Sequence, residues 1–159
     1  MPTALLDRTD RKILELLQKE GRLTNVELGE KVALSPSPYL RRVRALEEAG
    51  VIRQYVALVD PARVGLGLLA YVSVTLEKRG KMAGESFGRI VQTWSEVISC
   101  YSMTGDMDYL LRVHVQDLEH FTRFMMERLL KLTSVIDVKS TFVLESLKDT
   151  TALPLAHLK

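Results

Sequence analysis

The chain has one cysteine, one tryptophan and no long apolar segment among its 159 residues. A single cysteine excludes an internal disulfide, and because Cys100 lies in an apolar run we expect it to be a buried, unreactive thiol. No run approaches the roughly 18 apolar residues of a membrane helix, and residues 1–12 lack the apolar core of a signal peptide. We therefore expect a cytoplasmic protein with no membrane partner.

Neither sign of charge is in large excess. The net charge is +2, and residues 1–60 hold ten Lys and Arg against nine Asp and Glu. A nucleic-acid surface must therefore come from local arrangement. We expect one such module to bind DNA weakly by itself, because affinity grows with the number of phosphates neutralised. Pairing two such modules in an oligomer is the simplest way to raise the overall DNA affinity.

The residue patterns of metal and cofactor sites are missing as well. The three histidines and the cysteine do not follow zinc-ligand spacing. The stretch 105–108 (GDMD) lacks the other ligands of an EF-hand, and Gly65-x-Gly67 lacks the rest of a phosphate-binding fingerprint. We expect neither a metal nor a cofactor.

Residues 24–50 carry the clearest pattern that is present, two short helices separated by a tight turn. Thr24 and Glu27 have the spacing of a capping box, which starts the first of these helices. The pattern breaks at residues 33–34. Ser35 can cap the next helix and Pro36 suits its first turn. The second helix has an inward stripe and a glycine stop, made by Leu40, Val43, Leu46 and Gly50.

The second helix is also basic, which is typical of a helix that enters the major groove of DNA. An arginine cluster is often only a solvated face, but the helix spacing favours DNA binding, and hydroxyls and free N–H groups in the entry 35–38 (SPSP) favour it further because they suit phosphate oxygens. Successive residues lie about 100° apart on a helix, so at least one arginine is expected to be structural or paired with Glu47 or Glu48. The candidate DNA-binding residues are Ser35, Ser37, Tyr39, Arg41, Arg42 and Arg44.

The chain divides into two expected domains. The first covers residues 1–60: a helix capped by Asp7 and running to about Glu20, the two helices above, and a β-rich run at 51–58. Residues 61–67 form a hinge, and 68–159 form the second domain.

Helix and strand patterns alternate in the second domain in the order β-α-β-β-α-β, the ferredoxin-like arrangement of an α+β fold. Both helices should cover one face of the sheet. The other face would carry Tyr71, Ser73 and Thr75, is too apolar in places for water, and indicates self-association. The expected elements are a strand at 68–77, a polar turn at 78–81, a helix at 82–94, strands at 97–104 and 109–115, a helix capped by Asp117, and a strand at 135–147.

The chain resembles the Lrp/AsnC (leucine-responsive, feast/famine) family of transcription factors over nearly its whole length. The resemblance rests on several motifs in order and at matching spacings. They are LDxxDRKIL at 6–14, GRLT at 21–24, LSPSPxLRRV at 34–43, LExAGVI at 46–52, TGDxDYLLRV at 104–113 and KDTTALPL at 148–155. One departure is Tyr39, where the family commonly has Cys; its ring would contact DNA or pack on a neighbour.

The resemblance implies a winged helix-turn-helix, a linking strand and a ligand-sensing domain of ferredoxin-like topology. It implies a homodimer formed through the sheet that assembles further, commonly into an octamer, and a small effector, usually an amino acid, bound between dimers. A Gly-bearing turn with two carboxylates can offer an acceptor to an ammonium group and N–H donors to a carboxylate. The same turn is also ordinary Asp turn chemistry. The candidate effector-binding residues are Met103, Thr104, Gly105, Asp106 and Asp108, with Ser140 and Thr141 of the last strand nearby.

We therefore expect a transcriptional regulator that binds double-stranded DNA and responds to an amino acid, and not an enzyme. Two alternatives stay open. Relatives on the same plan decarboxylate haem precursors, and Arg112 and His114 on one strand suit tetrapyrrole carboxylates, although the basic helix argues against that activity. An effector-independent protein that wraps DNA on an oligomeric ring is the second alternative.

Overall fold

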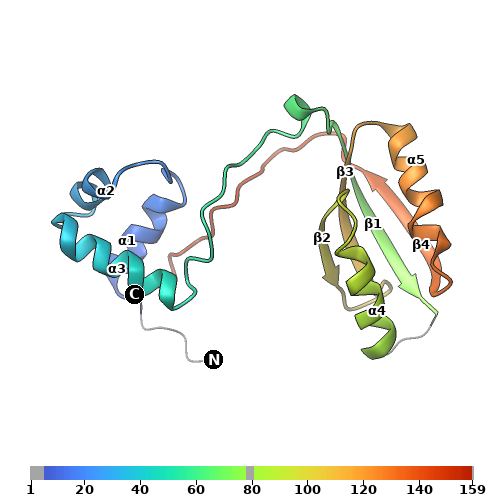
Figure 1. Ribbon diagram of the computed structural model, residues 1–159, viewed down its shortest axis with the longest axis horizontal. Helices are drawn as coiled ribbons and strands as arrows, with labels where there is room; N and C mark the ends of the chain where they lie inside the picture. The colour runs from blue at the N-terminus through green and yellow to red at the C-terminus, as the bar shows by residue number, and fades with distance from the viewer. Residues whose placement is uncertain (1–5, 78–80, 159) are drawn as a thin grey trace. The chain divides into compact units, whose positions relative to one another are not determined.

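The computed structural model describes residues 6–77 and 81–158, which fall into two compact units (Figure 1). One unit contains residues up to 57 and those from 148 onward, and the other contains residues 58–147. The expected ranges differ from these units, because residues 148–158 group with the first helices and not with the sheet. The turn expected at 78–81 falls mostly outside the described residues.

Three helices build the N-terminal unit: α1 (Arg8–Leu17), α2 (Asn25–Lys31) and α3 (Pro36–Glu48). Asp7 caps α1 as expected, since its side chain accepts hydrogen bonds from the N–H groups of Thr9 and Asp10. α1 ends at Leu17, about three residues earlier than expected. The helices enclose one apolar core, made by Ile13, Leu14, Leu28, Val32, Tyr39, Val43 and Leu46.

The C-terminal tail completes this core. Leu155 packs against it, and Arg11 Nη1 donates a hydrogen bond to the carbonyl of Leu158 at 3.2 Å. These contacts are the reason that the tail belongs to the N-terminal unit.

The strand expected at 51–58 is absent from this structure. Residues 53–60 have no regular secondary structure, and the side chains of Tyr55, Val56 and Leu58 are exposed. A strand needs a neighbouring strand for its backbone hydrogen bonds, and among the described residues none pairs with this segment.

The second unit has the expected β-α-β-β-α-β order (Figure 1). Its four strands form an antiparallel sheet in the order β2-β3-β1-β4. The last strand ends at Phe142 and not at 147. The elements are η1 (Ala62–Val64), β1 (Leu68–Leu76), α4 (Lys81–Val91), β2 (Val97–Ser102), β3 (Tyr109–Val115), α5 (Leu118–Glu127), η2 (Leu129–Lys131) and β4 (Val135–Phe142).

The alternation along β1 decides which face is the core. Val72, Val74 and Leu76 are buried, whereas Tyr71 is exposed, as the pattern predicts. The buried face packs against α4 and α5 through aromatic side chains such as Phe87 and Phe124. Both helices therefore cover one face of the sheet, and the face with Tyr71 stays open. None of the helices in the described part of the chain is long and apolar enough to cross a bilayer.

The expectation of a buried Cys100 is wrong. Cys100 is exposed, because it lies on β2, an edge strand with a neighbour on one side only.

Candidate nucleic-acid interface and effector turn

α2 begins as its sequence predicts. Thr24 Oγ1 accepts from the N–H of Glu27 at 3.3 Å, and Glu27 Oε2 accepts from the N–H of Thr24 at 2.8 Å. This reciprocal pair satisfies two helix-terminal donors.

The turn between α2 and α3 is tight. Ala33 has a φ of 58°, in the left-handed region that few non-glycine residues adopt. This reversal lets the N–H of Leu34 donate to the carbonyl of Gly29 at 2.8 Å. A Cβ on Gly29 would lie 2.9 Å from the carbonyl oxygen of Leu34. The absence of a side chain at Gly29 therefore allows the two helices to approach.

α3 begins at Pro36, with Ser35 in the cap position. The Ser35 side chain makes no capping hydrogen bond, so the expected side-chain cap is not formed. Ser35 is exposed at the start of the helix, as is Ser37.

The two sides of α3 differ sharply. Tyr39, Val43 and Leu46 are buried against α1 and α2. Ser37, Arg41 and Arg44 are exposed, and their spacing of four and three residues places them along one stripe of the helix. This stripe combines a hydroxyl near the helix N-terminus with two cations.

Tyr39 does not belong to the exposed stripe. Its side chain is 1% exposed and lies in the core beside Gly29, so the expectation that Tyr39 is a DNA-binding residue is wrong, and its ring packs on its neighbours instead. Burial is the main cause of the raised pKa of Tyr39, and the charge of Glu47 adds to it. The bulky ring fills the interior of the helix-turn-helix.

Arg42 is also turned away from the stripe. Its Nη1 atom donates to Asp7 Oδ2 and to Asp10 Oδ1, each at 2.8 Å. One arginine is thus structural, as the helix geometry predicted, but its partners are the two aspartates at the start of α1 and not Glu47 or Glu48. Hydrogen bonds to Asp10 and Asp7 raise the pKa of Arg42, while the N–H of Asp10 and the Arg42 guanidinium lower the pKa of Asp7.

The candidate effector turn joins β2 to β3. Met103, Thr104, Gly105 and Asp106 are all exposed there. Gly105 has a φ of 105°, a conformation that side-chain-bearing residues rarely adopt. The turn therefore presents backbone groups and a carboxylate to the outside.

Asp108 has a structural contact within this turn. Its Oδ2 accepts from the N–H of Leu76 at 2.8 Å, and its own N–H donates to the carbonyl of Val74 at 3.0 Å. The carboxylate thereby holds the turn against the end of β1.

Ser140 and Thr141 are not near this turn in one chain. The register places Ser140 opposite Val72 and Thr141 opposite Tyr71, whereas the turn meets β1 at Val74 and Leu76. Adjacent strand residues point to opposite faces, so Ser140 lies on the helix side and Thr141 on the open side.

The open face of the sheet holds an unusual polar pair. Arg112 and His114 lie two apart on β3, with Arg112 Nη2 3.4 Å from His114 Nε2. His114 is buried, and the Arg112 Nε and His114 Nδ1 atoms have no hydrogen-bond partner among the described residues.

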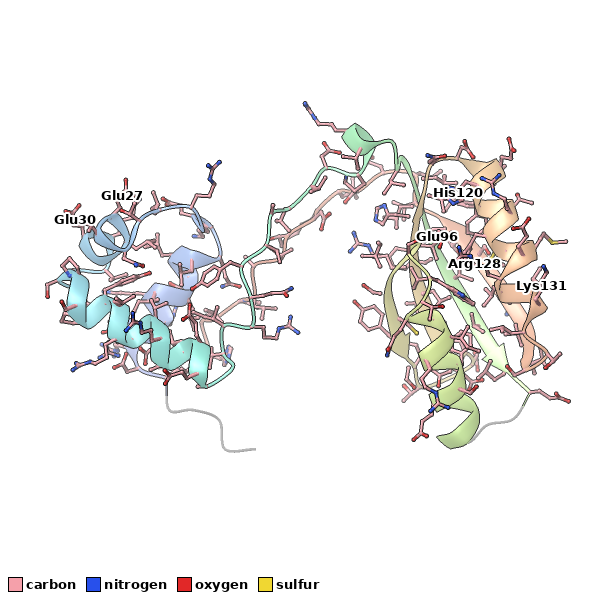
Figure 2. All side chains as sticks on the ribbon, in the orientation of Figure 1. Glu27, Glu30, Glu96, His120, Arg128 and Lys131 are labelled. Carbon is pink, nitrogen blue, oxygen red and sulfur yellow. The ribbon has the colours of Figure 1, made fainter. Side chains whose placement is uncertain are left out.

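A second polar cluster, which no sequence pattern indicated, joins α5 to the start of β2. Glu96 lies between His120 and Arg128 of this helical segment (Figure 2). Its carboxylate oxygens are 3.7 Å from His120 Nε2 and 3.4 Å from Arg128 Nη1. The i, i+8 spacing of His120 and Arg128 is visible in the sequence, but Glu96 is not adjacent to either in the chain. In the regions described here, no three His, Cys, Asp or Glu side chains gather in a way that could hold a metal ion.

Comparisons with known proteins match both units. The model of winged helix-turn-helix DNA-binding domains matches residues 6–53, and that of the Lrp/AsnC ligand binding domain matches residues 69–153. The leucine-responsive regulatory protein of Escherichia coli K12 is 42% identical over 148 residues, which is 93% of this chain and 90% of that protein.

Two solved structures share the fold over almost the full length. One is a transcriptional regulator from Neisseria meningitidis, solved as a complex with L-methionine. It is 51% identical to this chain with a TM-score of 0.93, and the match covers 97% of this chain and 99% of the Neisseria chain. The other is an AsnC family transcriptional regulator from Agrobacterium tumefaciens, which is 40% identical with a TM-score of 0.91. This match covers 97% of this chain and 100% of the Agrobacterium chain.

Proposed function

The chain belongs to the Lrp/AsnC family of DNA-binding transcriptional regulators, and we propose that it binds double-stranded DNA through the exposed stripe of α3 and senses an amino acid through its sheet unit. The observation that carries the proposal is the division of α3 into a buried side and an exposed side with Ser37, Arg41 and Arg44. A DNA partner also supports a location in the cytoplasm.

We assign separate roles to the residues of this stripe and of the helix start. Ser35 and Ser37 contact phosphate oxygens, Arg41 faces base edges, and Arg44 contacts the backbone. Hydroxyls at a helix N-terminus suit phosphates, and arginine is the commonest reader of guanine in the major groove.

Alanine variants of the two arginines test this interface. Arg41→Ala and Arg44→Ala are expected to weaken operator binding, and loss of a phosphate contact lowers the slope of log affinity against log salt by about one. Arg123→Ala removes the same charge from an exposed position on α5 and is the matched control. Unchanged binding of the Arg41→Ala, Arg44→Ala double variant would overturn the groove model.

We propose that the effector is an amino acid and that L-methionine is the first to test, because the 51% identical Neisseria relative was solved with it. The proposed contacts are the exposed groups of the turn, Met103, Thr104, Gly105 and Asp106, with Asp108 holding the turn in place. Ser140 and Thr141 would join this site from a second copy of the chain, since their own register keeps them away from it.

Thermal unfolding with each of the twenty amino acids tests the effector. A ligand at about 100 times its Kd stabilises the folded state by about 2.7 kcal/mol, enough to rank candidates. We expect Asp106→Ala to abolish the shift and Glu77→Ala, which removes an exposed acid outside the turn, to retain it. A flat response to every amino acid would instead favour the effector-independent architectural role.

We propose that the protein is a homodimer formed through the open sheet face and that dimers assemble further, with an octamer as the expected size. Tyr71 and Tyr101 are exposed on that face, with Arg112 and Thr141 opposite Tyr71 in the register. Light scattering measures the assembly, and Tyr71→Glu with Tyr101→Glu should give monomers.

We infer a regulator and not a tetrapyrrole decarboxylase. Arg112 and His114 do lie together, which is the feature that an enzyme of that kind would need. The relatives at 42% and 51% identity are, however, named as regulators. Absorbance titration of the purified protein with a tetrapyrrole tests the alternative, and a saturable spectral shift would support it.

A further inference from the structure

Three arginines lie within four residues on α3, and their surroundings differ. Arg42 donates to two carboxylates at 2.8 Å, and its side chain is 34% exposed. Arg41 and Arg44 are exposed on the stripe. Although the three arginines are close in sequence, Arg42 is paired with carboxylates whereas Arg41 and Arg44 are available to a partner.

The partners of Arg42 have a second task. Asp7 Oδ1 accepts from the N–H groups of Thr9 and Asp10, while Asp7 Oδ2 accepts from Arg42. Asp10 Oδ2 accepts from the N–H of Asp7, while Asp10 Oδ1 accepts from Arg42. Each carboxylate thus uses one oxygen for the capping box of α1 and the other for α3.

We propose that Arg42 is a positioning residue, which holds α3 against the N-terminus of α1 and does not contact DNA. This inference rests on the proposed function, since it concerns how the DNA-binding helix is held. The joint fixes the rotation of α3 about its own axis, because Arg42 lies between the buried side and the stripe. That rotation sets where Arg41 and Arg44 point.

The burial of Asp10 supports a permanent joint. Its side chain is 14% exposed, and a carboxylate removed from water without a cationic partner is unfavourable. If Arg42 moved to a phosphate, it would leave Asp10 and Asp7 unpaired beside a polyanion. A joint retained in the complex avoids that repulsion.

The direction in which DNA affinity changes when Asp7 and Asp10 are neutralised distinguishes a positioning role of Arg42 from a phosphate contact. If Arg42 contacts a phosphate, neutralising Asp7 and Asp10 frees it and removes two negative charges, so DNA affinity rises. If Arg42 positions α3, the same neutralisation loosens the helix, so affinity falls. Asparagine is a good N-cap, so Asp7→Asn keeps the cap of α1 while removing the charge that faces Arg42.

The experiment uses the full-length protein and a duplex that it binds. The variants are Asp7→Asn with Asp10→Asn, Arg42→Met, all three changes together, and Arg44→Ala as the reference for a direct phosphate contact. Affinity is measured over a series of salt concentrations, and circular dichroism melts report whether each variant is folded at the assay temperature.

We expect the aspartate double variant and Arg42→Met to lower affinity by a similar factor of about three to ten, the effect of removing one side-chain hydrogen bond. The salt slope should stay as in the parent for both, whereas Arg44→Ala, which removes a proposed contact to the DNA backbone, should lower it by about one. The triple variant should be no weaker than Arg42→Met, because all the changes break one joint.

Two results would overturn the inference. One is tighter binding by the aspartate double variant together with a salt slope reduced by about one in Arg42→Met, which would make Arg42 a phosphate contact. The other is parental affinity in every Arg42, Asp7 and Asp10 variant. Failure of the proposed function is distinct from both, because the Arg41→Ala, Arg44→Ala double variant would then bind as the parent does.

Discussion

Gln18 and Leu153 bond to each other in both directions across 135 residues of chain. Gln18 Oε1 accepts from the N–H of Leu153 at 2.6 Å, and Gln18 Nε2 donates to the Leu153 carbonyl at 3.3 Å. A side-chain amide that matches one residue's backbone donor and acceptor fixes the tail at the C-terminal end of α1.

Loss of this pair should loosen the tail. We expect Gln18→Ala to lower the free energy of unfolding of the N-terminal unit by about 1 kcal/mol, the usual net effect of an intramolecular hydrogen bond. Urea unfolding followed by circular dichroism measures it. Lys19→Ala, an exposed neighbour, is the control and should change stability little. Equal effects of the two variants would contradict a specific role for Gln18.

Gly29 is the point at which a side chain is least tolerated in the helix-turn-helix. We expect Gly29→Ala to destabilise the N-terminal unit by about 1–3 kcal/mol, the usual range for overpacking, because its Cβ would meet a backbone oxygen. Gly88 on α4 is the matched control, since a Cβ there has nothing within 4 Å. Gly88→Ala should stabilise the protein by up to about 1 kcal/mol through helix propensity. Thermal melts of the pair give the comparison, and a stabilised Gly29→Ala variant would contradict the close approach.

Tyr55 gives the protein a pH dependence at the alkaline end. The side chain of Tyr55 is 54% exposed, and its hydroxyl donates to Glu47 Oε1 at 2.9 Å; partial burial and this hydrogen bond raise the pKa of Tyr55 to about 12. The folded state holds a proton that the unfolded state loses above a pKa of about 10. The contribution of Tyr55 to the free energy of unfolding is therefore fully present below about pH 10 and is lost as the pH rises through about 12.

Difference titration of tyrosinate absorbance between the parent and Tyr55→Phe isolates this group. We expect Glu47→Gln to move the Tyr55 pKa downward, because a neutral partner no longer repels the tyrosinate. A Tyr55 pKa that stays the same in Glu47→Gln would show that the carboxylate is not its cause.

The contact between Glu96 and Arg128 should be measurable as a coupling. Glu96 is only 11% exposed, so its pairing with Arg128 is screened less than a surface ion pair. A double-mutant cycle with Glu96→Gln and Arg128→Met should give a coupling energy of about 1 kcal/mol. Urea unfolding of the four proteins supplies the values. Additive effects of the two changes would mean that the pair contributes nothing.

The second unit follows its sequence closely because its information is local. Alternation along β1 and the tight turn at 105–108 each act within a few residues, and the strands and helices occur in the predicted order, although β2, α4 and β4 end earlier than expected. The Asp117 cap of α5 is of the same kind, with its side chain accepting from the N–H of His120 at 2.8 Å.

Tyr39 could have been placed correctly from the sequence alone. It lies four residues before Val43 and seven before Leu46, so helical spacing puts all three on one side. Its polar hydroxyl and its place in a basic segment suggested an exposed role. Periodicity was the stronger guide.

Other features depend on contacts that no local pattern reveals. Arg42 finds Asp7 and Asp10 across 35 and 32 residues. The β-rich composition of 51–58 fits a strand, but a strand also needs a neighbour, and none of the described residues supplies one. The placement of Ser140 and Thr141 depended on the strand register, which only the sheet shows.

The return of residues 148–158 to α1 has a consequence for how the protein is made. The ribosome synthesises the three helices first, whereas Leu158, which accepts the hydrogen bond of Arg11, is synthesised 147 residues after Arg11. The N-terminal unit can therefore be completed only after residues 58–147, which form the other unit, have been synthesised. Contacts of such long sequence separation slow folding, and a nascent chain arrested before residue 153 should hold its three helices only loosely together.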